Sequence, residues 1–454
     1  MAAETKKVGF SSKLGLIMAT AGSAVGLGNI WKFPYIAGEN GGGAFLIIYL
    51  ACVILFGLPL MVTELFIGKQ SGKSAFGAFR ELRNNSRWQW LSWLCMITSF
   101  LIMGFYFVVT GWCFHYLVAA VGHVFKDLTT AQLTLHFDDF IANRPEVLGY
   151  SILAVIFTAA VLWFDVNKGI ERLSKILMPL LLIMMFLMAG RVLMLDGSNT
   201  GMAFFFQADF SKLDTRTILS ALGQCFFSLS IGMGALITYG AYMPKTQNIA
   251  ATSLQVAVLD TLVAVLAGLI IFPAVFAFGF NPAEGPELVF VVLPAIFEKM
   301  SFAWFSSILF FSLLCVAAVT STISLMEVAV AFITEATAKN KHPLDRRKSV
   351  LVVMAVVVVS MAACIYFPVV FKGFDMVSSC VLMPLNAFAM ALFVGWFLPK
   401  ADIRQGIVHS PIVAKELGKT EKWRHNLANV YIQIVRYIVP LAIIAIFLNG
   451  LGIW

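Results

Sequence analysis

The chain has 454 residues, of which 60% are hydrophobic and only 12% are charged. Charged residues make up about a quarter of an ordinary soluble domain, so this composition argues against one and indicates a protein that crosses the membrane many times. The formal net charge of +8 does not indicate nucleic-acid binding, because the basic residues cluster in particular short loops.

Eleven segments are apolar over the length that a helix needs to cross a bilayer. In chain order they lie near residues 12–37, 42–69, 89–121, 147–164, 170–194, 216–242, 252–280, 301–337, 348–370, 375–398 and 431–452. Lys and Arg concentrate in alternate loops, at residues 69–87, 168–175, 339–348 and 400–424. We interpret these loops as topology signals rather than binding surfaces. They predict a multi-pass protein of the plasma (inner) membrane with a cytoplasmic N-terminus and, after eleven spans, an external C-terminus.

The first span is interrupted at residues 22–29, which read Gly-Ser-Ala-Val-Gly-Leu-Gly-Asn. Backbone groups cannot stay unpaired in hydrocarbon, so a break at this depth must line a buried polar cavity. A second interruption, at residues 228–234, falls in the sixth span. Paired broken helices in corresponding halves of a chain indicate the central binding site of a transporter. The chain is therefore predicted to be a carrier.

The two breaks also predict the domain organisation. Spans 1–5 (residues 12–194) and spans 6–10 (residues 216–398) would be two five-helix repeats within a transporter core of residues 1–398. An odd number of spans in each repeat makes the two repeats inverted across the membrane. Residues 399–454 would add a cytoplasmic loop and the eleventh span.

Several polar residues lie where hydrocarbon makes them costly. Asp260 has only apolar and small neighbours, and it is either a charge beside a cation or proton site or a carboxylate near a helix end. Glu64 either ties broken backbone together by hydrogen bonds or contacts a ligand. The Thr-Ser-Thr run at 320–322 either bonds carbonyls one turn back or offers oxygens to a hard cation. Tyr106, in the middle of the third span, could donate to a carboxylate.

Other chemistries have little support in the sequence. The seven cysteines fall in apolar spans without zinc or redox spacing, so we expect buried, small hydrophobic side chains. The sequence holds no phosphate-binding loop for ATP and no nucleophile–base or metal motif of a membrane enzyme. A sensor that does not transport would need an output domain, and none is visible.

The run from Gly22 to Tyr35, followed by Glu-Asn-Gly-Gly-Gly-Ala-Phe from Glu39, resembles the first-span signature of the neurotransmitter:sodium symporters. The resemblance continues at residues 224–230 and 320–322 and covers nearly the whole chain. It implies an all-α polytopic membrane protein with the leucine-transporter-like fold, in which helices 1 and 6 are broken and an eleventh helix is appended. It also implies two co-transported sodium ions.

The same resemblance implies roles for individual residues. The first sodium site would consist of the Ala24 carbonyl, Asn29, Ser228 and Asp260. The second would consist of the Gly22, Val25 and Ala317 carbonyls with the Thr320 and Ser321 hydroxyls. The substrate would bind among Ala24, Gly26, Leu27, Gly28, Ile102, Tyr106, Phe227, Ser228, Ser230, Met233, Ser324 and Leu325, with its carboxylate at the Leu27 and Gly28 amides and the Tyr106 hydroxyl. Lys32 and Asp375 would form an outer gate, and Lys7, Tyr242 and Glu335 an inner gate.

Three positions refine the expected substrate and ions. Monoamine carriers of the family have an aspartate where Gly26 stands, so a glycine favours a substrate that brings its own carboxylate, an amino acid. Met233 replaces a phenylalanine of several relatives and suits a bulky apolar side chain. Ala264 replaces the small hydroxyl residue of chloride-dependent relatives, and Asp260 already supplies a negative charge.

The sequence thus predicts a sodium-coupled, chloride-independent symporter that imports a neutral, hydrophobic or aromatic L-amino acid by alternating access. Its partners would be the amino acid and the lipid bilayer, with no nucleic acid; the oligomeric state stays open. The main alternative is a carrier of the same architecture driven by protons. Asn29 and the 320–322 hydroxyls argue against it, because such a carrier needs no second cation site.

Overall fold

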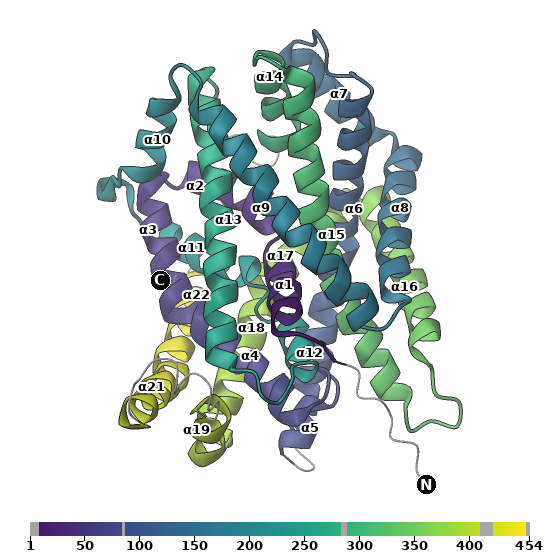
Figure 1. Ribbon diagram of the computed structural model, residues 1–454, viewed down its shortest axis with the longest axis vertical. Helices are drawn as coiled ribbons and strands as arrows, with labels where there is room; N and C mark the ends of the chain where they lie inside the picture. The colour runs from purple at the N-terminus through teal and green to yellow at the C-terminus, as the bar shows by residue number, and fades with distance from the viewer. Residues whose placement is uncertain (1–8, 84–86, 283–287, 409–420, 451–454) are drawn as a thin grey trace.

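The computed structural model describes residues 9–83, 87–282, 288–408 and 421–450, and these residues form a bundle of helices (Figure 1). They contain no extended strand, only an isolated bridge between Gly42 and Ala208. The helices of the first half are α1 (Lys13–Ala24), α2 (Phe33–Glu39), α3 (Gly43–Cys52), α4 (Leu58–Ser71), α5 (Ala78–Leu82), α6 (Gln89–Val121), α7 (Thr130–Ala142), α8 (Arg144–Leu162), α9 (Arg172–Leu193) and α10 (Ser198–Phe206).

The second half repeats the broken-helix pattern. Its helices are α11 (Thr215–Ser228), α12 (Ala235–Ala241), α13 (Ile249–Ala277), α14 (Leu293–Glu298), α15 (Ala303–Thr337), α16 (Arg346–Tyr366), α17 (Pro368–Met376), α18 (Met383–Leu392), α19 (Lys400–Val408), α21 (Glu421–Gln433) and α22 (Val439–Gly450). Short π-helical turns continue or link helices at Gly28–Lys32, Val53–Gly57, Asn167–Glu171, Leu288–Val292, Val377–Leu382, Phe393–Phe397 and Ile434–Ile438, and a 3₁₀ turn covers Phe210–Lys212.

The predicted spans correspond closely to these helices. Nine helices among the described residues are long and apolar enough to cross a membrane, and the bent pair Lys13–Ala24 and Gly28–Glu39 makes a tenth. The sixth predicted span is divided between α11 and α12, and neither piece is long enough to cross a membrane alone. The predicted all-helical, multi-pass fold with broken helices 1 and 6 is confirmed.

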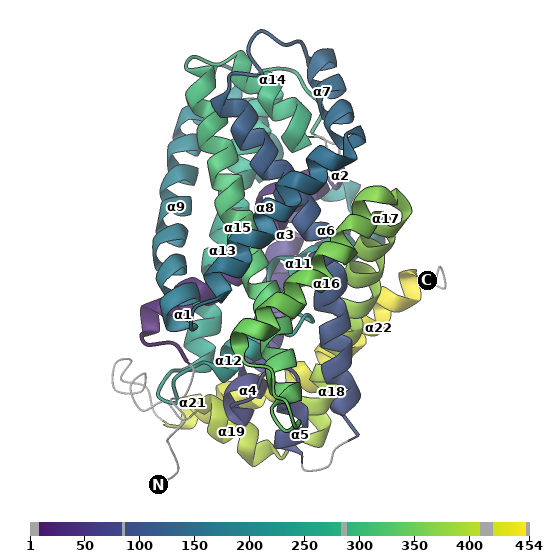
Figure 2. The same ribbon diagram turned by 90° about the vertical axis from the view of Figure 1, so that its right-hand side faces the viewer.

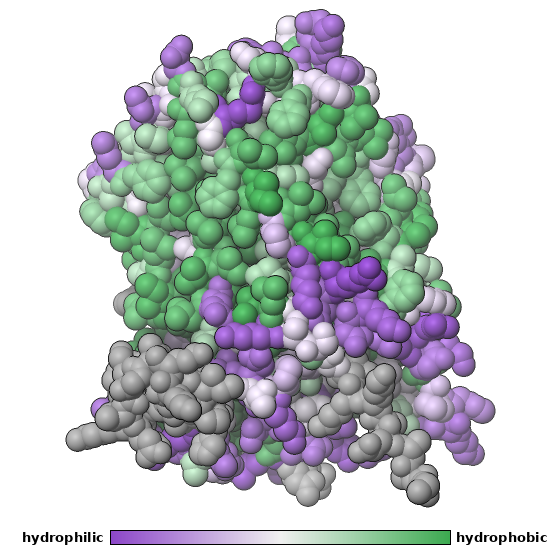
Figure 3. Space-filling view, viewed as in Figure 1, coloured by the Kyte–Doolittle hydropathy of each residue, from purple (hydrophilic) through white to green (hydrophobic). Residues whose placement is uncertain are grey.

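A broad hydrophobic band crosses the face of the bundle that Figure 3 shows. Large apolar side chains such as Ile54, Ile183 and Val359 are exposed by 65%, 57% and 71% respectively. Such exposure suits a surface solvated by lipid rather than water. Hydrophilic residues gather near the end of the bundle where α5, α19 and α21 lie, while α7 and α14 lie at the opposite end (Figures 1 and 2).

The expectation for the cysteines was wrong at one position. Six of the seven are buried, as expected of small hydrophobic side chains, but Cys380 is exposed. It lies in the π-helical turn between α17 and α18, in a segment with few buried residues. Cys380 lies near the charged groups of Lys32 and Asp375, so an apolar span does not guarantee a buried side chain.

Candidate functional site

The break in the first span begins where α1 ends at Ala24. Val25 is extended, with φ −68° and ψ 109°, and the chain becomes helical again at Gly28. The backbone groups freed by the break find partners inside the protein. The Gly26 N–H donates to Asn29 Oδ1 (3.1 Å), and the Leu27 N–H donates to the Tyr106 hydroxyl (3.0 Å).

Gln224 pairs a third backbone group of the first break. No separate role for this residue was predicted from the sequence. Its Nε2 donates to the Gly28 carbonyl oxygen (2.7 Å), which connects the second broken helix to the first. Gln224 is buried, so the bond is shielded from water. In the sequence, the one sign of a role for Gln224 is its position one turn before Ser228, within the run at residues 224–230 that resembles the family.

The break in the second half, at residues 229–234, is held by side chains from three other helices. Gly232 adopts a left-handed conformation (φ +84°) that favours glycine. Its N–H donates to Glu64 Oε1 (2.6 Å), and its carbonyl accepts from Asn386 Nδ2 (2.6 Å). The Met233 carbonyl accepts from the Ser99 hydroxyl (2.6 Å). Of the two interpretations of Glu64, the geometry favours the one in which it ties broken backbone together.

A first cluster of buried polar groups joins the two breaks. Asn29 Nδ2 lies 2.8 Å from both Ser228 Oγ and Asp260 Oδ1, and Ser228 Oγ donates to Asp260 Oδ2 (2.8 Å). All three side chains are fully buried. Tyr49, which the sequence analysis did not identify, also contacts Ser228 through its hydroxyl (3.2 Å). Asp260 is thus at the centre of the bundle and not near a helix end.

The donor set of this cluster fits a hard cation. Carboxylate, hydroxyl and amide oxygens are the ligands that such ions prefer. In the present arrangement the Asn29 amide nitrogen faces Asp260 and its oxygen faces the Gly26 amide. A cation between Asn29 and Asp260 would require the amide to turn its oxygen toward Asp260. Ala24 makes no hydrogen bond to this cluster among the described residues.

A second cluster lies between α1 and α15. The Thr320 hydroxyl is 3.0 Å from the Ala317 carbonyl oxygen and 3.5 Å from that of Val25. The Ser321 hydroxyl is 3.4 Å from the same Val25 oxygen. A Cβ on Gly22 would lie 3.3 Å from the Thr320 Cβ, so the glycine allows the two helices to approach closely. The Thr320 hydroxyl therefore bonds a carbonyl of its own helix, and both hydroxyls face the broken backbone of the first span.

A small cavity of about 20 Å³ lies next to both breaks. This volume has room for about one water molecule, so the side chains around it leave little free space. Its walls come from both breaks and from α6 and α15: Ser23, Ala24, Gly26, Gly28, Ile102, Tyr106, Phe227, Ser230, Met233, Ser321 and Leu325.

Most of the predicted substrate residues line this cavity, and three do not. The Leu27 N–H is paired with Tyr106, Ser228 faces Asp260, and the Ser324 hydroxyl donates to the Ser321 carbonyl (2.9 Å). Ser23, which the sequence analysis did not select, is part of the wall. Its hydroxyl is buried and has no hydrogen-bond partner among the described residues.

Lys32 and Asp375, the residues of the predicted outer gate, form an ion pair. Lys32 Nζ lies 3.4 Å from Asp375 Oδ1 and 4.3 Å from the centre of the Phe227 ring. Phe227 itself lines the cavity. Lys32 therefore lies against the Phe227 ring, which is part of the cavity wall.

Of the predicted inner-gate residues, Tyr242 and Glu335 bond to different partners. Tyr242 donates to Glu327 Oε1 (2.7 Å), and Glu327 forms a bidentate ion pair with Arg346 (2.8 and 2.7 Å). Glu335 instead accepts from the Ser74 N–H (3.0 Å) and side chain and pairs with Lys73. Lys7 lies outside the described residues.

Helical register explains why Tyr242 bonds to Glu327 and not to Glu335. Glu327 and Glu335 are on the same helix, about two turns apart, and only Glu327 is fully buried. A buried carboxylate requires a charged or hydrogen-bonded partner, which Arg346 supplies. Tyr242, Glu335 and Arg346 all line a larger cavity of about 740 Å³ on the side of the α5 end of the bundle.

Comparison with known proteins identifies the family. The family model described as "Sodium:neurotransmitter symporter family" matches residues 7–128 and 131–412. The chain belongs to this family. A sodium-dependent transporter of Bacillus subtilis, YhdH, is 37% identical over 460 residues, covering 99% of each chain. A sodium-dependent transporter of Haemophilus influenzae is 32% identical over 464 residues, covering 97% of this chain and 98% of the relative.

A solved structure supports the same assignment. The crystal structure of MhsT in complex with L-phenylalanine matches the chain with a TM-score of 0.87 and 36% sequence identity, covering 97% of this chain and 99% of MhsT. Membership of the family, the fold and the multi-pass membrane location are thereby confirmed. The chain is a sodium-dependent transporter and not an enzyme.

Glu64 provides a direct test of how the second break is held. Glu64→Ala leaves the Gly232 N–H without an acceptor inside the bundle, which costs about 1–3 kcal/mol. We expect a lower thermal unfolding midpoint for the purified protein in detergent. Glu64→Gln, the matched control, keeps an oxygen that accepts from Gly232, so most of the stability should remain. Equal unfolding midpoints for the two variants would contradict this role.

Proposed function

We propose that this transporter is a sodium-coupled symporter that imports a neutral, hydrophobic or aromatic L-amino acid by alternating access. The observation that supports the proposal is that two oxygen-rich clusters lie against the first break, one bonded to the Gly26 amide through Asn29 and one facing the Val25 carbonyl, next to a cavity lined by both breaks. Each cluster would bind one sodium ion, the co-transported cation. The cavity, which has a volume of about 20 Å³ in this conformation, would widen to hold the amino acid.

In this proposal the first ion couples directly to the substrate. With the Asn29 amide turned, the cluster of Asn29, Ser228 and Asp260 would offer oxygens from three elements. The carboxylate of the amino acid would complete the shell together with the Ala24 carbonyl. The Leu27 and Gly28 amides and the Tyr106 hydroxyl would hold the other side of that carboxylate. Because ion and substrate share a contact, each raises the affinity for the other by the same factor.

The cavity wall supports an amino acid with an apolar side chain. Gly26 brings no carboxylate of its own, and a Cβ there would overlap the Ser321 hydroxyl and lie 2.7 Å from the Tyr106 hydroxyl oxygen. The side-chain part of the wall contains Ile102, Phe227 and Met233. MhsT, with a similar fold, was solved in complex with L-phenylalanine. A hydrophobic or aromatic L-amino acid is therefore the substrate class we propose.

The second ion would bias the conformational change. Bound between the Val25 carbonyl and the hydroxyls of Thr320 and Ser321, it would hold the first break against α15. Its release would free α1 to move and open the path toward the larger cavity near Tyr242. The N-terminus and this cavity would face the cytoplasm in the proposed topology, since the basic loops lie at that end.

Binding of radiolabelled amino acids to the purified protein tests the proposal. Leucine, phenylalanine, tyrosine and tryptophan should bind saturably in sodium chloride, and binding should be lost when potassium replaces sodium. Equally strong binding in potassium would reject sodium coupling and favour the proton-driven carrier.

Thr320→Ala tests the second sodium site. Loss of one hydroxyl ligand should raise the sodium concentration for half-maximal binding by about tenfold while the ranking of amino acids stays the same. The matched control is Thr110→Ala, because the Thr110 hydroxyl donates only to the carbonyl of its own helix at Tyr106. Sodium titrations that coincide for the wild type and Thr320→Ala would reject this site.

Chloride independence is a further part of the proposal. Ala264 lies one turn after Asp260 on α13 and offers no hydroxyl, while Asp260 supplies a negative charge beside the first ion. Sodium-driven uptake should therefore continue at an unchanged rate when gluconate replaces chloride on both sides of the membrane. Loss of uptake in gluconate would show that chloride is required.

A further inference from the structure

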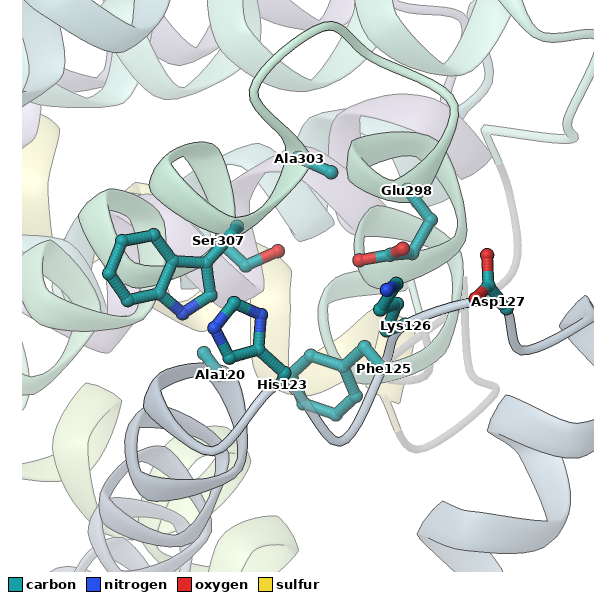
Figure 4. A pocket seen from close by; sticks show the side chains of 9 residues that line it. Ala120, His123, Phe125, Lys126, Asp127, Glu298, Ala303 and Ser307 are labelled. Atoms are coloured by element: carbon teal, nitrogen blue, oxygen red, sulfur yellow. The ribbon is translucent and has the colours of Figure 1, made fainter.

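A third cavity, separate from the two described above, lies at the end of the bundle where α7 and α14 lie (Figure 4). It has a volume of about 260 Å³ and lies between the C-terminal end of α6, the loop that follows, and the segment from α14 into α15. This is slightly below the volume of sites for drug-sized ligands, roughly 300–1,000 Å³. It shares no residue with the central cavity, so the inference below does not depend on the proposed transport function.

The wall of this cavity contains both signs of charge. Lys126, Asp127 and Glu298 line it, and none of them forms an ion pair with another described residue. In Figure 4, Lys126 and Asp127 come from the loop after α6 and Glu298 comes from the end of α14. An ammonium and two carboxylates around one small space are complementary to a ligand that also carries both signs.

Ser307 adds an observation that points independently to a ligand. Its side chain is only 2% exposed, and its hydroxyl has no hydrogen-bond partner among the described residues. Figure 4 shows this hydroxyl directed into the same space as the Glu298 carboxylate. Buried hydroxyls are nearly always hydrogen-bonded, because leaving one unpaired costs free energy. A polar atom of a bound molecule would satisfy it.

A flat aromatic wall and an apolar rim complete the cavity. The His123 ring stacks on Trp304 with 4.9 Å between ring centres and an 8° angle between planes. Beside the cavity, Val121, Phe302 and Phe305 are exposed by 53%, 77% and 50%. Tryptophan is common where a membrane protein meets the lipid headgroups, and Trp304 lies in this wall next to exposed apolar side chains.

We propose that this cavity binds a compact zwitterion, a molecule with an ammonium group and an acidic oxyanion a few bonds apart. The ammonium would lie against Glu298 and Asp127, while the oxyanion would contact Lys126 and accept a hydrogen bond from Ser307. Two sources provide this chemistry: the headgroup of phosphatidylethanolamine and a free zwitterion such as phosphoethanolamine. The apolar rim favours the lipid, because its acyl chains would cover Val121 and Phe305.

Native mass spectrometry of the delipidated, full-length protein in detergent measures this binding directly. Three ligands are compared: dihexanoyl-phosphatidylethanolamine, dihexanoyl-phosphatidylglycerol, which lacks the ammonium group, and O-phosphoethanolamine, which lacks acyl chains. Glu298→Gln and Lys126→Gln each remove one charge from the cavity. Asp138→Asn is the matched control, because Asp138 is an exposed carboxylate on α7 at the same end of the bundle and does not line the cavity.

The ethanolamine lipid should bind the wild type more tightly than the glycerol lipid does. Glu298→Gln should weaken binding of the ethanolamine lipid by about tenfold or more, whereas Asp138→Asn should leave this binding unchanged. If O-phosphoethanolamine binds as tightly as the lipid and shows the same dependence on Glu298, the zwitterion site stands and its ligand is a free molecule. Binding that is absent for both zwitterions, or that Glu298→Gln and Lys126→Gln do not weaken, overturns the proposal. Unchanged thermal unfolding midpoints of these variants in detergent would show that they are folded.

Discussion

The structure depends on one constraint: backbone groups freed by a helix break inside a membrane must find partners within the protein. The first break is paired by Tyr106 and Gln224, and the second by Glu64 and Asn386. These side chains come from α4, α6, α11 and α18, which are far apart in the sequence. Pairing the breaks therefore also positions the helices around them.

The same pairing produces the polar interior that transport requires. Because the first helix stops at Ala24, backbone carbonyls that a continuous helix would pair internally accept from side chains of other helices instead, as those of Val25 and Gly28 do. Asn29 shows this double role, since its oxygen caps the Gly26 amide while its nitrogen contacts Asp260. Binding of a cation there would alter the pairing of the break itself. In our account, ion binding and helix position are linked for this reason.

Much of this arrangement could be predicted from the sequence, because hydrocarbon imposes strict rules on composition. The spans, both breaks and the unusual positions of Asp260 and Glu64 all stand out against apolar neighbours. Tyr49, Ser99 and Asn386 do not stand out, because a tyrosine, serine or asparagine in a span has many possible partners. Only the packing of distant helices shows that each of them faces a break or its polar cluster.

The inner network shows a different limit of sequence analysis. Arg346 lies in a basic loop region that we interpreted only as a topology signal, and the structure places it against Glu327 in the eighth span. Glu335 lies on the same helix and carries the same charge, so residue type could not distinguish the two. Burial distinguishes them, and burial depends on how α15 and α16 pack. The packing of α15 against α16 cannot be read from the residues of either span alone.

The measurement that most directly tests the central claim is uptake of L-phenylalanine into proteoliposomes under imposed ion gradients. An inward sodium gradient should drive accumulation above the external concentration, and an inside-negative membrane potential should increase it if net charge moves inward. Collapsing the sodium gradient at constant pH should stop accumulation. Accumulation driven equally well by a proton gradient without sodium would contradict the account.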